Sequence, residues 1–91
     1  MKDNSDYYSI FPNPIRDKGT ITFKMDAGSK VSLLIYDVNG KLVYSIINDK
    51  QFDSGTYSYD INTSILSDGI YYSKLKQGDS KIVIRKILVI K

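Results

Sequence analysis

The chain has 91 residues and a formal net charge of +3, and it contains no cysteine, histidine or tryptophan. The length fits one small domain with a single core. The missing side chains exclude disulfides, thiolate or imidazole metal ligands, and nucleophiles that histidine activates. We therefore expect a single domain that is not an enzyme and that uses no cofactor or metal.

The composition favours β structure throughout. All ten acidic residues are aspartate, and the only alanine is Ala27, so good helix formers are scarce. Isoleucine, valine and the eight tyrosines suit a pleated, half-buried surface. Aspartate and glycine recur at intervals that suit turns. These features predict an all-β domain.

The chain begins with a short polar and acidic stretch, residues 1–6, without the apolar segment of a signal peptide. No stretch reaches the roughly 18 apolar residues that a membrane helix needs. We interpret residues 1–6 as the remnant of a linker from a larger precursor, and residues 7–91 as the domain. A part of the precursor outside this chain would then set the cellular location.

Two strands are expected before residue 30. The first covers Tyr7–Phe11 and ends at Pro12, Asn13 and Pro14, because each proline fixes φ and withholds an amide donor. The second covers Thr20–Met25, where apolar and polar residues alternate with the period of a half-buried strand. A turn should follow the second strand.

A hairpin is the strongest local signal in the chain. The pair Asn39-Gly40 tolerates the positive φ values of a tight turn, which should join Val31–Tyr36 to the return strand Leu42–Asn48. The inner face of the first of these strands should carry Val31, Leu33 and Ile35. Residues 37–40 also resemble the start of a calcium loop, but the chain has no distal glutamate. A turn is the better interpretation.

The next two strands flank a crossover. They are expected at Thr56–Ile61 and at Ile70–Gln77. Between them, Leu66, Gly69 and Tyr71 have the spacing Leu-x-x-Gly-x-Tyr. This spacing is typical of a tyrosine corner, in which the tyrosine hydroxyl returns to the backbone a few residues upstream and glycine allows the bend.

The last eleven residues predict a strand that runs to the final residue. One face would carry Ile82, Ile84, Lys86, Leu88 and Ile90, and the other Val83, Arg85, Ile87, Val89 and Lys91. Both faces are largely apolar, so we expect part of the strand to project or to cover a neighbour until a partner takes it. A strand at a chain end must either be packed against the rest of the fold or be recognised by a binding partner.

The same region of the chain is basic. Residues 74–91 contain one acidic residue, Asp79, and six basic residues: Lys74, Lys76, Lys81, Arg85, Lys86 and Lys91. An excess of this kind attracts nucleic acid, anionic lipid or an acidic receptor. Lysine on an exposed strand also protects a sheet edge from aggregation, and we favour this interpretation over attraction of nucleic acid, anionic lipid or an acidic receptor. Self-association through an exposed edge strand stays open.

Seven short strands separated by regular turn signals predict an all-β fold. We expect a seven-stranded antiparallel β-sandwich, immunoglobulin-like or fibronectin III-like. A small barrel is the alternative. No repeat of 20 to 50 residues is visible, which excludes propellers and solenoids.

Four motifs in a fixed order resemble a known family. They are Phe11-Pro12-Asn13-Pro14, Ile35–Val43, Gly69-Ile70-Tyr71-Tyr72 and Lys86–Lys91. Together they resemble the C-terminal sorting domain, type A, of the type IX (Por) secretion system over about residues 8–91. The first motif of that family usually begins with Tyr-Pro, and here Phe11 replaces one aromatic ring by another.

The resemblance implies a secretion signal and not a catalyst. Domains of this kind are C-terminal parts of proteins that certain Gram-negative bacteria export. After transport to the periplasm, the folded domain is recognised by the outer-membrane translocon. A cell-surface sortase of cysteine-protease type commonly removes it and joins the cargo to lipopolysaccharide. The implied partners are thus the translocon, the sortase and an N-terminal cargo, and the implied destination is the cell surface or the medium.

The resemblance also assigns roles to residues. The recognition residues would be Gly69, Tyr71, Lys86 and Lys91, and the fold motifs would be Pro12, Asn13, Pro14, Asn39 and Gly40. Cleavage would fall within residues 1–8. On physical grounds Tyr71 is first a packing and corner residue, and Gly69 is conformational. Lys86 lies on an otherwise apolar face, where its charge needs a partner or a route to water.

Two other functions stay open. A non-catalytic accessory sandwich of a secreted enzyme would bind carbohydrate by stacking sugar rings on tyrosines such as Tyr7, Tyr44 or Tyr72. Flagellar hook-cap proteins carry a sandwich with a similar Ile-Tyr-Asp-x-x-Gly hairpin, which gives a structural assembly role as a third function. Saturable sugar binding that is lost on tyrosine-to-alanine substitution would separate the accessory module from a sorting signal.

Overall fold

The computed structural model describes residues 8–79 and 81–91, and strands make up most of it. In chain order the strands are β1 (Tyr8–Phe11), β2 (Lys18–Met25), β3 (Ser29–Asp37), β4 (Leu42–Phe52), β5 (Gly55–Asn62), β6 (Gly69–Gln77) and β7 (Lys81–Val89). A short 3₁₀ helix, η2 (Thr63–Ile65), lies between β5 and β6. Within these described ranges, no helix is long and apolar enough to cross a membrane.

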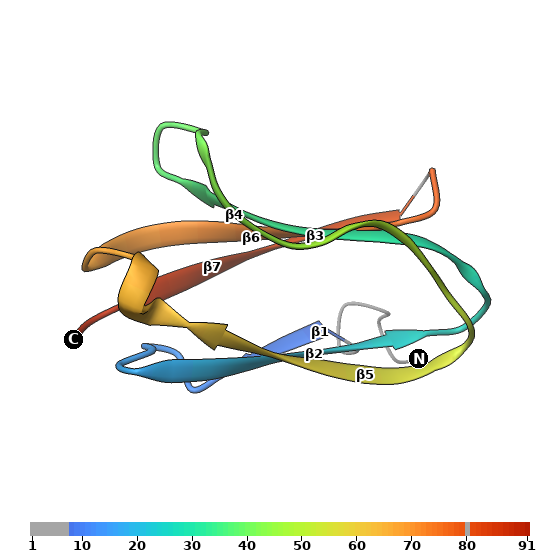
Figure 1. Ribbon diagram of the computed structural model, residues 1–91, viewed down its shortest axis with the longest axis horizontal. Helices are drawn as coiled ribbons and strands as arrows, with labels where there is room; N and C mark the ends of the chain where they lie inside the picture. The colour runs from blue at the N-terminus through green and yellow to red at the C-terminus, as the bar shows by residue number, and fades with distance from the viewer. Residues whose placement is uncertain (1–7, 80) are drawn as a thin grey trace, which may run out of the picture.

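The strands form two antiparallel sheets that pack face to face (Figure 1). The smaller sheet has the strand order β1-β2-β5, and the larger sheet has the order β4-β3-β6-β7. The chain crosses between the layers after β2, after β4 and after β5. This arrangement confirms the predicted immunoglobulin-like or fibronectin III-like sandwich, and the two separate sheets exclude the small barrel.

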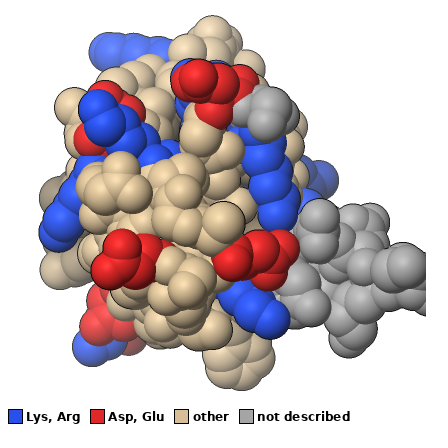
Figure 2. Space-filling view, turned by 90° about the vertical axis from the view of Figure 1, so that its right-hand side faces the viewer, with Lys and Arg blue, Asp and Glu red and all other residues tan. Residues whose placement is uncertain are grey.

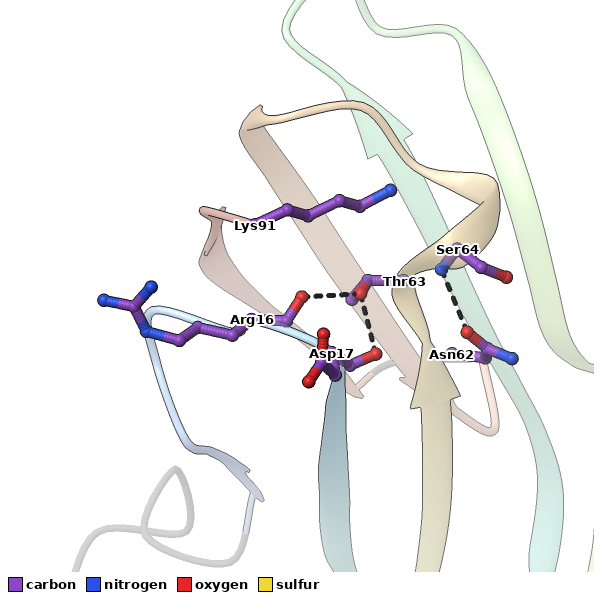
Figure 3. Close-up of a pocket in the computed structure, with 6 residues that line it drawn as sticks. All are labelled: Arg16, Asp17, Asn62, Thr63, Ser64 and Lys91. Atoms are coloured by element: carbon purple, nitrogen blue, oxygen red, sulfur yellow. Dashed lines mark hydrogen bonds between the residues drawn. The ribbon is translucent and has the colours of Figure 1, made fainter.

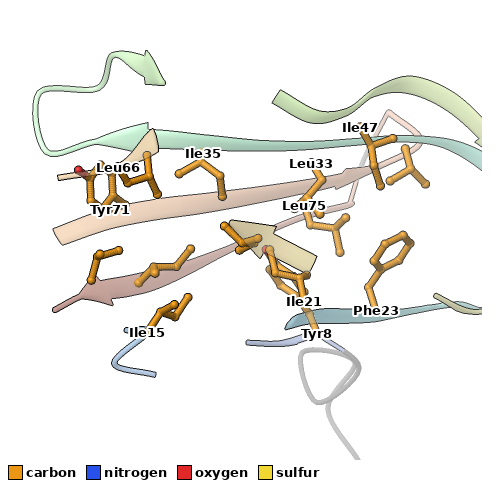
Figure 4. Close-up of a cluster of buried hydrophobic side chains, with 14 of the residues drawn as sticks. Tyr8, Ile15, Ile21, Phe23, Leu33, Ile35, Ile47, Leu66, Tyr71 and Leu75 are labelled. Carbon is orange, nitrogen blue, oxygen red and sulfur yellow. The ribbon is translucent and has the colours of Figure 1, made fainter. Parts of the chain in front are cut away.

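The core lies between the two sheets and takes alternate side chains from each strand (Figure 4). Two of the three inner strands, β2 and β3, bury Ile21, Phe23, Met25, Val31, Leu33 and Ile35. Phe23 also packs its ring 5.8 Å from the ring centre of Phe52 and 5.6 Å from that of Tyr57. The predicted inner face of β3 is therefore confirmed, and a small aromatic cluster fills the β4–β5 side of the core.

The strand after the hairpin is longer than the sequence predicts. β4 continues past Asn48 to Phe52, because a bulge shifts its register against β3 and Lys50, Gln51 and Phe52 remain paired with that strand. At one irregularity Asp49 has a positive φ of 52°, and its N–H donates to Ser32 Oγ at 3.0 Å. The polar residues 48–51 thus pass along the surface, and the strand returns Phe52 to the core.

The hairpin turn itself is present with a different geometry. Only Gly40 has a positive φ, of 84°, and Asn39 does not. The reason is that the Asp37 side chain accepts hydrogen bonds from backbone N–H groups of the turn. Its Oδ1 accepts from the N–H of Asn39 at 2.9 Å and from that of Lys41 at 3.0 Å. The Gly40 N–H donates to the Asp37 carbonyl at 3.0 Å. The carboxylate is thus the internal acceptor of a turn.

Candidate functional site

β7 is the edge strand of the larger sheet. It pairs with β6 along its whole length, from Lys81 opposite Gln77 to Val89 opposite Gly69. Of the two expected arrangements, projection is wrong over Lys81–Val89, because β6 offers an antiparallel partner of equal length there. The strand also ends at Val89, before the end that the sequence predicts.

The two faces of β7 differ in burial. On the inner face, Ile87 and Val89 are buried in the core. On the outer face, Ile82 is 49% exposed and Ile84 is 56% exposed, and the Lys86 side chain reaches water. One of the two apolar faces is therefore core, and the other is surface. Exposed apolar side chains that gather in one place mark interaction surfaces.

The segment after β1 closes one half of the free edge of β7. The Asn13 side chain bridges two backbone groups: Nδ2 donates to the Lys86 carbonyl at 3.0 Å, and Oδ1 accepts from the Leu88 N–H at 3.1 Å. Ile15 then donates to the Leu88 carbonyl at 2.8 Å and accepts from the Ile90 N–H at 2.9 Å. Residues 13–15 therefore act as a short extra strand, which we call the edge clamp.

The residues around Asn13 explain how a side chain comes to replace backbone. Pro12 and Pro14 have no N–H group and cannot donate to a ladder. The peptide bonds before both prolines are cis. Ile15 is fully buried and forms an isolated parallel bridge with Val89. The sequence predicts the strand break at these prolines, but not the contact between the clamp and β7.

A buried chain of hydrogen bonds ties β1 to β6 and β7 across the sandwich. The Tyr8 hydroxyl donates to Ser73 Oγ at 2.6 Å, and Ser73 Oγ donates to the Arg85 carbonyl at 3.3 Å. The Arg85 guanidinium lies 5.8 Å from the centre of the Tyr8 ring. Burial raises the pKa of Tyr8 to about 12, although the hydrogen bond with Ser73 and the charge of Arg85 act in the opposite direction.

This hydrogen-bond chain is a feature that sequence reasoning missed. A serine at an inward position of an otherwise apolar strand pattern is the signal that points to it, because a buried hydroxyl needs partners. Ser73 occupies such a position in β6 and is completely buried. The partner on β1, 65 residues away, carries no matching signal in its own segment.

The predicted tyrosine corner is confirmed. The Tyr71 hydroxyl donates to the Ser67 carbonyl at 2.7 Å, and the Tyr71 side chain is turned into the core with only 8% of it exposed. Gly69 has a φ of 150°, a value that other residues rarely adopt. A Cβ at Gly69 would meet no atom within 4 Å, so the backbone conformation and not the available space calls for glycine.

The four predicted recognition residues do not form one surface. Gly69 and Tyr71 belong to β6, with Tyr71 facing inward. Lys86 belongs to β7 and is exposed on the outer face. Lys91 lies beyond β7, and its N–H donates to Asp68 Oδ1 at 3.1 Å. The structure therefore brings Lys91 next to the turn that contains Gly69 and places Lys86 on a separate surface.

Lys91 also borders a polar hollow at this end of the sandwich (Figure 3). The hollow has a volume of about 380 Å³ and is lined by Arg16, Asp17, Asn62, Thr63, Ser64 and Lys91. The hydroxyl of the buried Thr63 shares its single proton between the carbonyl oxygens of Arg16 and Asp17, at 3.0 Å and 2.7 Å from Oγ1. These bonds join the β5–β6 crossover to the start of β2, so the polar groups serve the fold.

Other surfaces bear on the alternatives. Figure 2 shows the end of the molecule on the right of Figure 1, where basic and acidic side chains are interspersed. Of the tyrosines considered for sugar stacking, Tyr72 is 38% exposed, Tyr44 packs partly on the core, and Tyr7 lies outside the described residues. In the part of the chain that the structure describes, no three histidine, cysteine or acidic side chains converge as metal ligands.

Comparison with known proteins gives a family match and similar solved structures. The family model of the secretion system C-terminal sorting domain matches residues 9–91. A solved structure of PorZ is similar, with a TM-score of 0.69 and 24% sequence identity. PorZ is described as an essential bacterial surface component of the type-IX secretion system of human oral-microbiomic Porphyromonas gingivalis. The search of curated proteins gave no match.

The structural match shows a shared fold. It covers 97% of this chain and 12% of the PorZ chain, so the chain spans a small part of that protein. The family match, in contrast, covers nearly all of the sequence and includes the edge clamp, the tyrosine corner and β7. The chain belongs to the secretion system C-terminal sorting domain family, and it is a C-terminal sorting signal of the type IX secretion system.

Proposed function

We propose that this domain is a non-catalytic export signal for a cargo protein that is attached to its N-terminal side. A sorting signal of this family directs export to the cell surface or the medium. In the proposed route, the precursor passes through the periplasm of a Gram-negative cell, and the folded domain then binds the outer-membrane translocon. A cell-surface sortase afterwards removes the domain and joins the cargo to anionic lipopolysaccharide.

The position of β7 carries this proposal. β7 lies at the edge of the larger sheet, with Ile82, Ile84 and Lys86 exposed on its outer face. A receptor can read such a strand through main-chain hydrogen bonds and through the alternate side chains. A strand enclosed between two others would have no free main-chain groups for such pairing.

The proposal places the cargo boundary at the start of the chain. Residues 1–6 are the remnant of the linker, residues 7–91 are the sorting domain, and the cleaved bond lies within residues 1–8. Residues 1–7 lie outside the described residues, so this assignment rests on their polar, acidic sequence. The family match, which begins at residue 9, supports it.

Within the domain, we assign receptor contact to Lys86 and Lys91, whose side chains are both exposed. Gly69 and Tyr71 contribute through the fold, since they form the bend and the corner that lead into β6. Pro12, Asn13 and Pro14 contribute in the same way, because they supply the edge clamp.

The experiment is a fusion test in a host that has a type IX system. A secreted reporter is joined ahead of residues 1–91, and surface and medium fractions are compared with those of an authentic sorting signal. We expect export of the reporter. Retention of the reporter in the periplasm, while the authentic signal exports it, would overturn the proposed function.

A matched control separates folding from recognition. Leu33→Asp places a charge at a completely buried position, so the domain should unfold and the reporter should stay inside the cell. Lys18→Ala removes a lysine from the start of β2 in the other sheet and should leave export unchanged. Equal export from the Leu33→Asp fusion would show that the folded sandwich is not what the translocon reads.

A further inference from the structure

The free edge of β7 has a closed half and an open half. In an antiparallel edge strand, alternate residues turn their N–H and C=O groups toward the same side. Lys86, Leu88 and Ile90 turn theirs toward the edge clamp. Ile82 and Ile84 fall in the same alternation and turn theirs to the same side. The open half therefore runs from Ile82 to the N–H of Lys86.

The amide groups of the open half are available for pairing. Within residues 8–79 and 81–91, the N–H groups of Ile82, Ile84 and Lys86 have no acceptor. The Ile84 carbonyl accepts one long hydrogen bond, of 3.4 Å, from Nη1 of the adjacent Arg85. A row of unpaired backbone groups beside exposed apolar side chains is a template for another strand.

Apolar and basic side chains alternate around the open half. Ile82 and Ile84 lie opposite Lys76 and Lys74 of β6, and Lys86 follows on β7. Among the described residues, no carboxylate lies within ion-pair distance of these three lysines. The surface beside the open edge is therefore apolar and positive, and a strand that lies against it gains from apolar and acidic residues.

We propose, on the basis of the proposed function, that the open half binds an extended acidic segment of the export machinery, which adds as a fifth strand to the larger sheet. Its backbone pairs with Ile82 and Ile84, and its apolar side chains lie beside theirs. An acidic side chain lies beside Lys86. Docking stops there, because the Lys86 carbonyl already accepts from Asn13.

Charge favours this partner over a second copy of the chain. Two β7 strands that paired edge to edge would place the basic outer face, which carries Lys74, Lys76 and Lys86, beside the same face of the second copy. Like charges on neighbouring strands destabilise the pairing. Self-association through this edge is therefore an outcome that the test must detect.

The test uses the reporter fusion of residues 1–91 with variants at Ile84. Ile84→Pro removes an N–H that the fold does not use, at an edge position where proline is tolerated. We expect an unchanged unfolding midpoint and at least tenfold less exported reporter. Ile84→Thr keeps the N–H and the β-branched shape and should retain most of the export.

A charge pair tests the chemistry of the partner. Ile84→Asp places a negative charge on the open half, and Ile84→Lys places a positive charge at the same position. An acidic partner predicts a larger export loss for Ile84→Asp than for Ile84→Lys. An equal loss, or the reverse order, overturns the acidic partner.

The outcomes separate the two proposals. If the unaltered domain fails to export the reporter, the proposed function fails. If it succeeds and Ile84→Pro also exports normally, the open edge is not the docking site. If Ile84→Pro and Ile82→Pro both unfold the domain, the fold itself uses this edge, which also overturns the inference. A dimer in sedimentation that Ile84→Pro abolishes would assign the edge to a second copy of the chain.

Discussion

Asn13 shows how one side chain can take the place of a strand residue. Its amide donates to one backbone group of β7 and accepts from another, at 3.0 Å and 3.1 Å. No other short side chain offers a donor and an acceptor in one plane. Asn13 therefore fixes Lys86 as the residue where the clamped half of the free edge begins and the open half ends.

We predict that Asn13→Ala lowers the free energy of unfolding by about 1–3 kcal/mol, since two backbone groups of β7 lose their partner. The Leu88 amide should exchange with solvent faster in the variant. Asn13→Asp should not restore stability, because it sets an oxygen against the Lys86 carbonyl. The measurements are urea unfolding and amide hydrogen exchange.

The control for this prediction is Asn39→Ala. Asn39 lies in the exposed β3–β4 turn, where its backbone N–H and not its side chain makes the recorded bond. Its replacement should change stability by less than about 0.5 kcal/mol. Wild-type stability in Asn13→Asp would show that the bond to the Lys86 carbonyl contributes nothing.

The second residue-scale prediction concerns Tyr71. Tyr71→Phe keeps the buried ring and removes the hydrogen bond to the Ser67 carbonyl, so unfolding should become easier by about 1 kcal/mol. Export of the fused reporter should stay normal, because the hydroxyl faces Ser67 and not solvent. Tyr72→Phe, at the exposed neighbour, is the control. A tenfold loss of export at unchanged stability would make Tyr71 a direct contact.

At the scale of the element, β7 contributes buried side chains to the core and exposed side chains to the surface. Deleting residues 86–91 removes the buried Ile87 and Val89 and the bonds to the clamp. Each buried side chain contributes about 1.5–3 kcal/mol, and a small domain has few kcal/mol to lose. We predict that the deletion blocks export because the domain unfolds, as circular dichroism would show. Normal surface delivery of the deletion variant would remove the second half of β7 from the mechanism.

Single substitutions separate the role of the exposed side chains from that of the buried ones. Lys86→Ala and Lys91→Ala remove exposed side chains and leave the backbone bonds of both residues in place. We predict reduced export at an unchanged unfolding midpoint, with the larger effect in the double variant. Lys18→Ala, on the other sheet, controls for the loss of one charge. Unchanged export from the double variant would exclude both lysines as receptor contacts.

The elements that sequence predicts well are those with local causes. The alternation in β2 and β3, the turn at Gly40 and the Tyr71 corner depend on residues within a few positions of one another. The edge clamp joins residues 73 and 75 positions apart, and Tyr8 bonds to a serine 65 positions away. No local pattern encodes such pairs, because they depend on how the two sheets stack.

The bulges of β4 escaped prediction for a different reason. Residues 48–51 are polar and exposed, so their composition resembles that of a loop. The positive φ of Asp49 and its bond to Ser32 keep this stretch in register with β3. The sequence also shows that both faces of β7 are largely apolar. Which face is buried followed only from its place at the edge of the larger sheet.

At the scale of the whole molecule, Tyr8 couples the two sheets, since it lies in β1 and its hydroxyl bonds to Ser73 of β6. Its pKa is raised from 10.0 to about 12 by burial. Below pH 10 the Tyr8 hydroxyl is protonated in the folded and the unfolded state, so the stability that depends on the neutral hydroxyl is fully present. Between pH 10 and 12 the unfolded chain releases the proton while the folded domain retains it, so stability falls as the pH rises.

We predict that this fall amounts to about 2–3 kcal/mol by pH 12, since each pKa unit corresponds to about 1.4 kcal/mol. Tyr8→Phe removes the ionisable group, so the difference in unfolding free energy between wild type and variant should be constant below pH 10 and then shrink. Urea unfolding at pH 8, 9, 10 and 11 measures this difference. Parallel profiles through pH 11 would mean that the Tyr8 hydroxyl ionises equally in both states, and that Tyr8 is not buried in the folded domain as described.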